Sequence, residues 1–113
     1  MIVVSNSTPI ISLATVGHIP LLSALFGRIA IPREVEHELK SNKYPGYQDI
    51  YQEWCDIRDV QGTLYVGFLC HDLDRGEAEA ITLAKELRAD ALILMNERDI
   101  RLPNNRGFMS SGH

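Results

Sequence analysis

Short apolar runs alternate with stretches of helical spacing along this chain. Residues 2–5, 28–31 and 91–95 are largely apolar and are bounded by polar positions, which predicts neighbouring buried strands of a parallel sheet. Between these runs, apolar side chains recur every three or four residues, as in helices that cover a sheet. Helices are therefore expected between Pro9 and Gly17, over residues 19–26 and 33–40, and from near Glu77 through the apolar positions of residues 80–87. This alternation predicts an α/β fold with an open parallel sheet of roughly four or five strands.

Capping residues support the start and the end of the first predicted helix. Asn6 or Thr8 can cap the helix that follows the first strand, and Pro9 stands where a missing N–H costs nothing. Gly17 is placed to end this helix. The change from apolar strand to polar helix cap within a few residues is typical of the positions where α/β proteins build polar sites.

The region between residues 47 and 69 is the hardest to interpret. Its aromatic and apolar side chains fit a helical stripe, which indicates core packing more strongly than a base-stacking platform. That stripe consists of Tyr47, Ile50, Tyr51 and Trp54. Residues 57–60 can form a short strand, and residues 107–109 are expected to form a last strand before the chain stops.

Composition and charge narrow the class of protein. The 113 residues form a single expected domain, residues 1–113, and a hydrophobic content of 45% is enough for a sizeable core. The net charge of −4 argues against attachment to nucleic acid by bulk positive charge. Cys55 and Cys70 lack metal-ligand spacing, and no targeting sequence or membrane span is recognisable, so a cytoplasmic protein is expected.

Four polar positions stand where an α/β fold brings side chains together. Asn6 and Asn96 directly follow apolar runs, Glu38 lies on the third predicted helix, and Glu77 lies near the start of a later helix. The carboxyl ends of parallel strands border the ligand crevice, so these groups are candidates for one site. Convergent carboxylates suit hard cations such as Mg²⁺ or Mn²⁺, which promote phosphodiester hydrolysis.

Three motifs in the same order carry a family resemblance. The opening VVSNSTPI at residues 3–10 resembles the "VVSDTSPL" of PIN domains, particularly the branch close to VapC-type toxins. Residues 73–81, LDRGEAEAI, match the family's "LDxGEAEAI". Residues 94–98, LMNER, correspond to a segment in which the family has an aspartate before "ER". Weaker similarity between these motifs extends the resemblance over most of the chain.

The resemblance implies a metal-dependent nuclease that cuts RNA, with a central parallel sheet between helices. The family's metal-binding acids fall on Asn6, Glu38, Glu77 and Asn96, so Glu38 and Glu77 are the candidate catalytic acids. The implied cofactor is Mg²⁺ or Mn²⁺. Because an amide offers one carbonyl oxygen and no charge, the two asparagines predict weakened metal binding.

Each candidate also has a structural interpretation. Asp74 and Glu77 have a spacing close to that of a capping box, Glu38 suits a solvated helix face, and Asn6 and Asn96 suit caps after strands. Glu97 and Asp99 are alternatives for a displaced ligand. Nucleic-acid contacts are expected from Thr8 and Arg98, although Arg98 also suits a solvated surface.

The family continues into a further helix where this chain stops at His113, so a C-terminally truncated PIN-like fold and a partly uncovered sheet face are expected. Burial of that face predicts a homodimer. Two functions remain open: a weakened toxin-like ribonuclease, or a non-catalytic module that binds RNA, an antitoxin-like protein or itself. Deliberate inactivation of a toxic nuclease also explains the two asparagines.

Overall fold

The computed structural model describes residues 1–95 and contains a four-stranded parallel sheet. The strands lie in the order β3-β2-β1-β4. Their bounds are β1 Val3–Ser5, β2 Ile29–Pro32, β3 Cys55–Arg58 and β4 Ala91–Ile93. The α/β fold with an open parallel sheet is confirmed, and the three apolar runs predicted to be neighbours do lie side by side.

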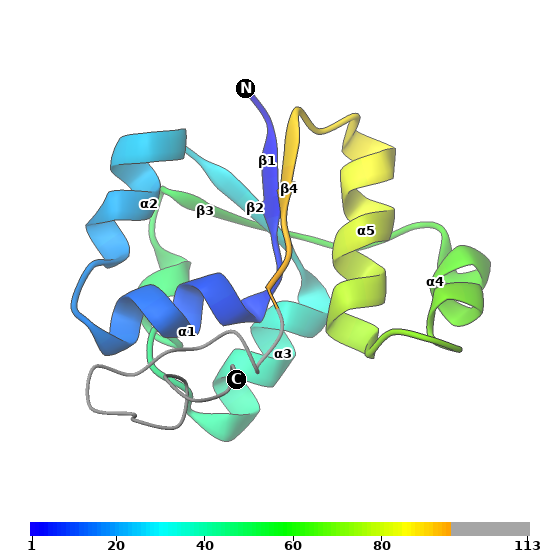
Figure 1. Ribbon diagram of the computed structural model, residues 1–113, viewed down its shortest axis with the longest axis horizontal. Coiled ribbons are helices and arrows are strands. Elements are labelled where there is room, and N and C mark those ends of the chain that lie inside the picture. The colour runs from blue at the N-terminus through cyan, green and yellow to red at the C-terminus, as the bar shows by residue number, and fades with distance from the viewer. Residues whose placement is uncertain (96–113) are drawn as a thin grey trace, which may run out of the picture.

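The first strand is central to the sheet. Val3 is in register with Ile29 of β2 and with Ala91 of β4, so β1 pairs on both sides. All four strands run in one direction, and their carboxyl ends lie together at the end of the sheet where α1 begins (Figure 1). This common end collects the residues that follow β1, β2 and β4.

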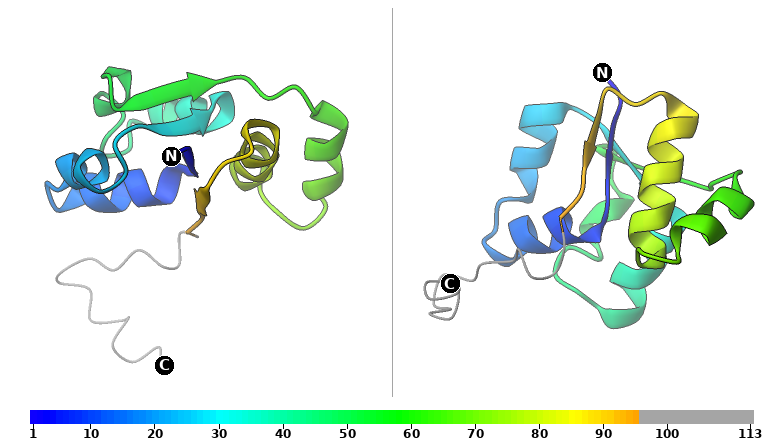
Figure 2. Two further views of the ribbon diagram at one scale, coloured as in Figure 1. Left: turned by 90° about the horizontal axis from the view of Figure 1, so that it is seen from above. Right: turned by 45° about the vertical axis from the view of Figure 1, so that its right-hand side comes forward.

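Helices cover both faces of the sheet (Figure 2). On one face lie α1 Ser7–Thr15, α2 Ile19–Phe26 and α3 Arg33–Asn42. On the other lies α5 Arg75–Leu87, and α4 Thr63–Leu69 packs against α5. Because side chains alternate along a strand, Val3 and Ile29 point toward the first layer while Val4 and Ala30 point toward α5. A sheet covered on both faces explains why these runs are continuously apolar.

The helix boundaries follow from glycines and from one acidic cap. Helix α1 ends just before Gly17, as predicted, and Gly27 ends α2 with a φ of +75°, a conformation that favours glycine. The Asp74 carboxylate caps α5 by accepting a hydrogen bond of 2.8 Å from the backbone N–H of Glu77. Asn6 occupies the N-cap position of α1, but its side chain makes no capping bond.

Several predictions for the second half need correction. The run 91–95 was expected to be fully buried, but β4 ends at Ile93 and is half-exposed because β1 is its only partner strand among the described residues. Residues 47–54 contain the 3₁₀ turn Asp49–Tyr51 in place of a helix; Ile50 and Trp54 are buried, as core packing predicted, but Tyr51 is exposed. The third strand begins at Cys55 rather than residue 57, and the expected strand at 107–109 lies outside the described residues.

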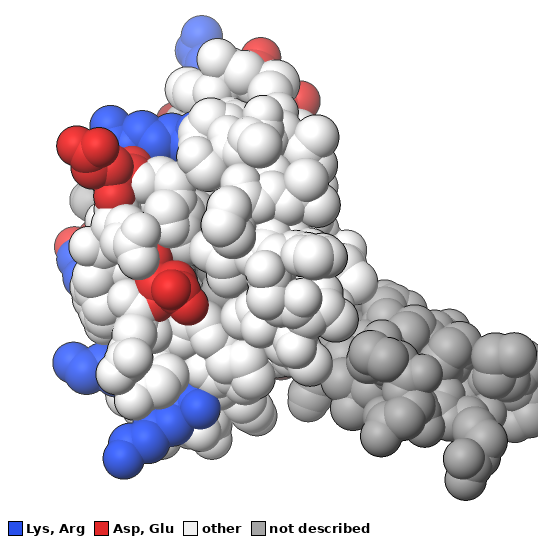
Figure 3. Space-filling model, turned by 90° about the vertical axis from the view of Figure 1, so that its left-hand side faces the viewer, with Lys and Arg blue, Asp and Glu red and all other residues white. Residues whose placement is uncertain are grey.

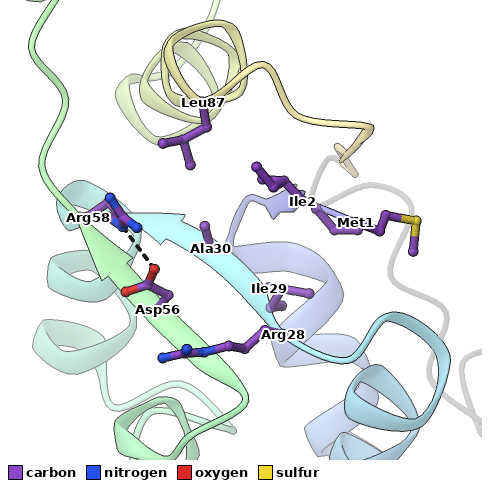
Figure 4. Close-up of a pocket in the computed structure, with 9 residues that line it drawn as sticks. Met1, Ile2, Arg28, Ile29, Ala30, Asp56, Arg58 and Leu87 are labelled. Carbon is purple, nitrogen blue, oxygen red and sulfur yellow. Dashed lines mark hydrogen bonds and ion pairs between the residues drawn. The ribbon is translucent and has the colours of Figure 1, made fainter.

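A cavity of about 210 Å³ opens near the amino-terminal ends of β1 and β2, on the side of the sheet that α5 covers (Figure 4). Its lining includes Ile2, Ala30 and Leu87, together with Arg58, whose Nε lies 2.8 Å from an Asp56 carboxylate oxygen. This hollow is at the opposite end of the sheet from the polar residues that follow the strands. Within residues 1–95, no helix is long and apolar enough to cross a membrane.

The core contacts predict unequal costs for two leucine truncations. Leu39 of α3 is fully buried, whereas Leu64 of α4 is 91% exposed. Leu39→Ala should lower the free energy of unfolding by about 2–5 kcal/mol, because it leaves a cavity among the side chains beneath the sheet. Leu64→Ala should change it by less than about 0.5 kcal/mol. Urea denaturation of both variants measures the difference, and equal losses would contradict the assigned packing.

Candidate functional site

The carboxyl end of β1 is tied to the segment after β4 by Asn6. Asn6 is buried, with 4% of the residue exposed. Its Nδ2 donates a hydrogen bond of 2.7 Å to the Met95 carbonyl, and its Oδ1 accepts one of 3.2 Å from the Met95 N–H. Asn6 is therefore a buried residue that connects the end of β1 to Met95, which directly precedes Asn96 in the sequence.

The next residue connects this junction to α3. Ser7 is buried in the first turn of α1, and its hydroxyl donates a hydrogen bond of 3.0 Å to Oε1 of Glu38. Because Ser7 directly follows Asn6, this bond brings the Glu38 carboxylate to the carboxyl end of β1. The local sequence explains it: the chain turns from strand to helix at Asn6, which directs the first helical side chain toward α3.

Glu38 also lies against the start of α5. A Cβ atom built on Gly76 would lie 3.2 Å from Glu38 Oε1 and 3.5 Å from Asp74 Oδ1. The glycine thus leaves room for a carboxylate beside the first turn of α5, where backbone N–H groups and the helix dipole favour negative charge. Glu77 follows in the same turn, so α3 and α5 bring both predicted catalytic acids to one end of the sheet.

A second contact holds the two helices in this arrangement. The Glu79 carboxylate accepts a hydrogen bond of 3.2 Å from the backbone N–H of Glu34, in the first turn of α3. The Arg75 Nε lies 3.5 Å from Glu79 and 3.8 Å from Glu34. This cluster neutralises part of the charge that Glu34 and Glu79 bring together and fixes α3 against α5.

The electrostatics of Glu77 favour binding of a proton or another positive charge. Partial burial raises the pKa of Glu77 above its usual value, and the nearby negative charge of Asp74 raises it further. A carboxylate that is costly to ionise in isolation gains more from a nearby cation than an exposed one.

The predicted site residues differ in how the structure places them. Asn6, Glu38 and the α5 turn that carries Glu77 form one connected region, whereas Asn96 and Arg98 lie outside the described residues. Thr8 is only 4% exposed, so contact between its side chain and nucleic acid would require a local rearrangement. Within residues 1–95, no group of three or more His, Cys, Asp or Glu side chains is arranged to hold a metal ion.

Three contributors were not recognised as such in the sequence. Ser7 orients Glu38, Gly76 makes room for it, and Glu79 holds α3 from α5. The glycine had a visible signal, since it lies within the GEAEA motif. The partners of Ser7 and Glu79 are 31 and 45 residues away, and no local pattern encodes such pairings.

The oxygen atoms of this region are of the kind that bind a hard divalent cation, but they carry too little negative charge. Carboxylate, amide and hydroxyl oxygens are the groups that Mg²⁺ and Mn²⁺ prefer. However, the Asn6 amide is already bonded at both of its polar atoms. Glu38 and Glu77 are the acids that remain at the matched positions.

Comparison with protein families agrees with this arrangement. A family model described as a PIN domain (DUF3368) matches residues 2–106. The chain belongs to the PIN domain family. This membership agrees with the parallel sheet and indicates a nuclease-like fold of a family that generally uses divalent metals and often binds RNA. The comparisons found no match among curated proteins. They also found no match among solved structures.

The close approach of Gly76 to Glu38 in this PIN domain predicts a difference between two glycine substitutions. Gly67 of α4 has no atom within 4 Å of a built Cβ, so Gly67→Ala should stabilise the protein by about 0.5–1 kcal/mol. Gly76→Ala should gain less, because its methyl group must displace the Glu38 carboxylate.

Chemical denaturation measures both stabilities, and the NMR resonance of the Glu38 carboxyl carbon reports its position. That resonance should move in Gly76→Ala and stay in place in Gly67→Ala. An unchanged Glu38 resonance in both variants would contradict the contact.

Proposed function

We propose that this chain is a PIN-domain ribonuclease of the VapC toxin-like branch whose metal centre is weakened. The observation that carries the proposal is the contact of Glu38 with both the start of α1 and the start of α5, which carries Glu77. The motifs at residues 3–10 and 73–81 support the toxin-like branch. The substrate we assign is RNA.

The chain's own residues would bind the ion and orient its ligands. Glu38 and Glu77 would contribute carboxylate oxygens, and Asn6 and Asn96 amide oxygens. A bound Mg²⁺ or Mn²⁺ would supply an activated water and stabilisation of the leaving oxygen. Ser7 would keep Glu38 oriented through its hydrogen bond, as outer partners of metal ligands do. We assign Arg98 to a phosphate contact beside the site.

The expected weakness follows from charge. Two carboxylates neutralise one divalent cation only if both are ionised, and the raised pKa of Glu77 makes its ionisation more costly. The amides at positions 6 and 96 add oxygen atoms without charge. Mg²⁺ gives up its hydration shell reluctantly, so a site with this little charge should hold it poorly.

A non-catalytic binding module is the second candidate. The bond that favours it is the one from Asn6 Nδ2 to the Met95 carbonyl, because an aspartate has no donor there. If the protein depends on this hydrogen bond, asparagine at position 6 has a structural role of its own and is not a weakened metal ligand. In that case the PIN fold would bind RNA or a protein partner without cutting.

A protein partner is also part of the proposal, and α2 offers the surface for it. Residues 1–27 contain no Asp, Glu, Lys or Arg, and Leu21 and Leu25 are 44% and 60% exposed on α2. Figure 3 shows a broad area without charged side chains on this side of the molecule. A charge-free face lets an acidic protein contact its own copy without like-charge repulsion, so we assign it to a homodimer.

RNA cleavage with Mn²⁺ tests the catalytic assignment. The double variant Asn6→Asp, Asn96→Asp should cleave a structured RNA roughly tenfold faster than the unaltered chain, because it returns two charges to the metal ligands. Adding Glu77→Gln to the double variant should abolish the gain. Calorimetric Mn²⁺ titration of the same proteins separates binding from chemistry. A double variant that binds Mn²⁺ no better and does not cut would favour the binding module.

Light scattering at micromolar concentration tests the homodimer. The unaltered chain should behave as a dimer, and Leu25→Glu should convert it to a monomer by placing two like charges across the contact. Leu64→Glu is the matched control on α4 and should leave the dimer intact. A monomer at all concentrations would argue against self-association. The charge-free face of α2 would then be assigned to binding of an antitoxin-like protein.

A further inference from the structure

We infer that Asn6 is a positioning residue. Its side-chain amide locks the carboxyl ends of β1 and β4 together, so that these two strand ends are held in place without a cation. The inference goes beyond the proposed nuclease function and does not require that RNA be cut. It concerns what position 6 does in the metal-free protein.

The hydrogen bonds at this junction continue the pairing of β1 with β4 beyond its last residue pair. Ser5 is in register with Ile93, and the backbone N–H of Asn6 donates a bond of 3.2 Å to the Ile93 carbonyl. The Asn6 side chain then makes the two bonds to Met95 described above, one as donor and one as acceptor. The Asn6 side-chain amide thus pairs as a backbone peptide unit would, and it extends the pairing of β1 with β4 from Ile93 to Met95.

An ionised aspartate cannot make the same pair of bonds. An ionised carboxylate accepts hydrogen bonds and donates none. Its second oxygen would face the Met95 carbonyl where Asn6 now has a 2.7 Å donor contact, so two oxygen acceptors would oppose each other in a partly buried place. Asparagine and aspartate have nearly the same shape, yet the amide satisfies both bonds at this junction, whereas an ionised carboxylate satisfies only one.

Within residues 1–95, the hydrogen bonds of the Asn6 side chain do not serve the helix that begins after it. Asn6 occupies the N-cap of α1, where asparagine commonly bonds to the helix N–H groups, but it makes no such bond. Its hydrogen bonds go to Met95, 89 residues away. An aspartate at this position would need a cation to compensate the repulsion, which makes the amide a metal-independent substitute.

Thermal unfolding in EDTA tests the lock with three variants. Asn6→Asp should lower the unfolding midpoint by about 5–15 °C, since it loses a partly buried hydrogen bond and gains an oxygen–oxygen repulsion. Asn42→Asp is the matched control, because Asn42 also donates its amide to a backbone carbonyl but is exposed. Its midpoint should fall by less than half as much. If Asn6→Asp does not fold in EDTA, Asn6→Ala carries the test.

Amide hydrogen exchange distinguishes positioning from general stability. In Asn6→Asp and Asn6→Ala, the Met95 amide should exchange at least about tenfold faster than in the unaltered chain, after correction for global unfolding. The Leu83 amide in α5 should keep its corrected rate. An Asn6→Asp midpoint equal to that of the unaltered chain in EDTA, or a Met95 amide that exchanges no faster in either variant, would overturn the lock.

Addition of Mn²⁺ separates this inference from the proposed function. Mn²⁺ should raise the midpoint of Asn6→Asp by more than that of the unaltered chain, and should have no larger effect on Asn6→Ala. If the losses in EDTA appear and Mn²⁺ restores nothing, the lock is supported and the metal centre is rejected.

Discussion

Parallel pairing of β1 with a strand on each side is the constraint on which the rest of this PIN domain depends. Val3 and Val4 are buried on opposite faces of the sheet, so β1 contributes to both hydrophobic clusters. A strand buried in this way can bear polar residues only where it ends. The candidate site begins at that end, with Asn6 and Ser7, because the interior of the sheet is filled by apolar side chains.

Polar groups at this end are held by bonds across long sequence separations. Ser7 reaches Glu38 of α3, and Asp74 and Gly76 shape the turn of α5 that carries Glu77. The negative charges gather at the start of α5, where the helix dipole partly compensates them. The compensation is incomplete, because burial and the charge of Asp74 still raise the pKa of Glu77. A positive charge at this end of the sheet is therefore favoured.

The sequence predicted the sheet and its flanking helices well where the apolar pattern was strong. It was less informative between residues 47 and 69, where α4 has Leu64 and Phe68 exposed to solvent. Apolar spacing normally indicates buried faces, so an exposed apolar helix cannot be distinguished from core by pattern alone. The same limit explains β4, whose apolar run suggested full burial although it lies beside one partner strand in the described part of the chain.

By itself, the sequence determined the α/β class, the central apolar strands, the capping pair Asp74 and Glu77, and the family motifs that single out Asn6, Glu38, Glu77 and Asn96. These are properties of neighbouring residues and of ordered motifs, which a linear pattern can hold. Only the tertiary structure decided that the Asn6 amide bonds to Met95 and that Glu38 accepts a hydrogen bond from Ser7. Those partners are set by the order and register of the strands, because hydrogen bonds between distant residues form only after the sheet has brought the segments together.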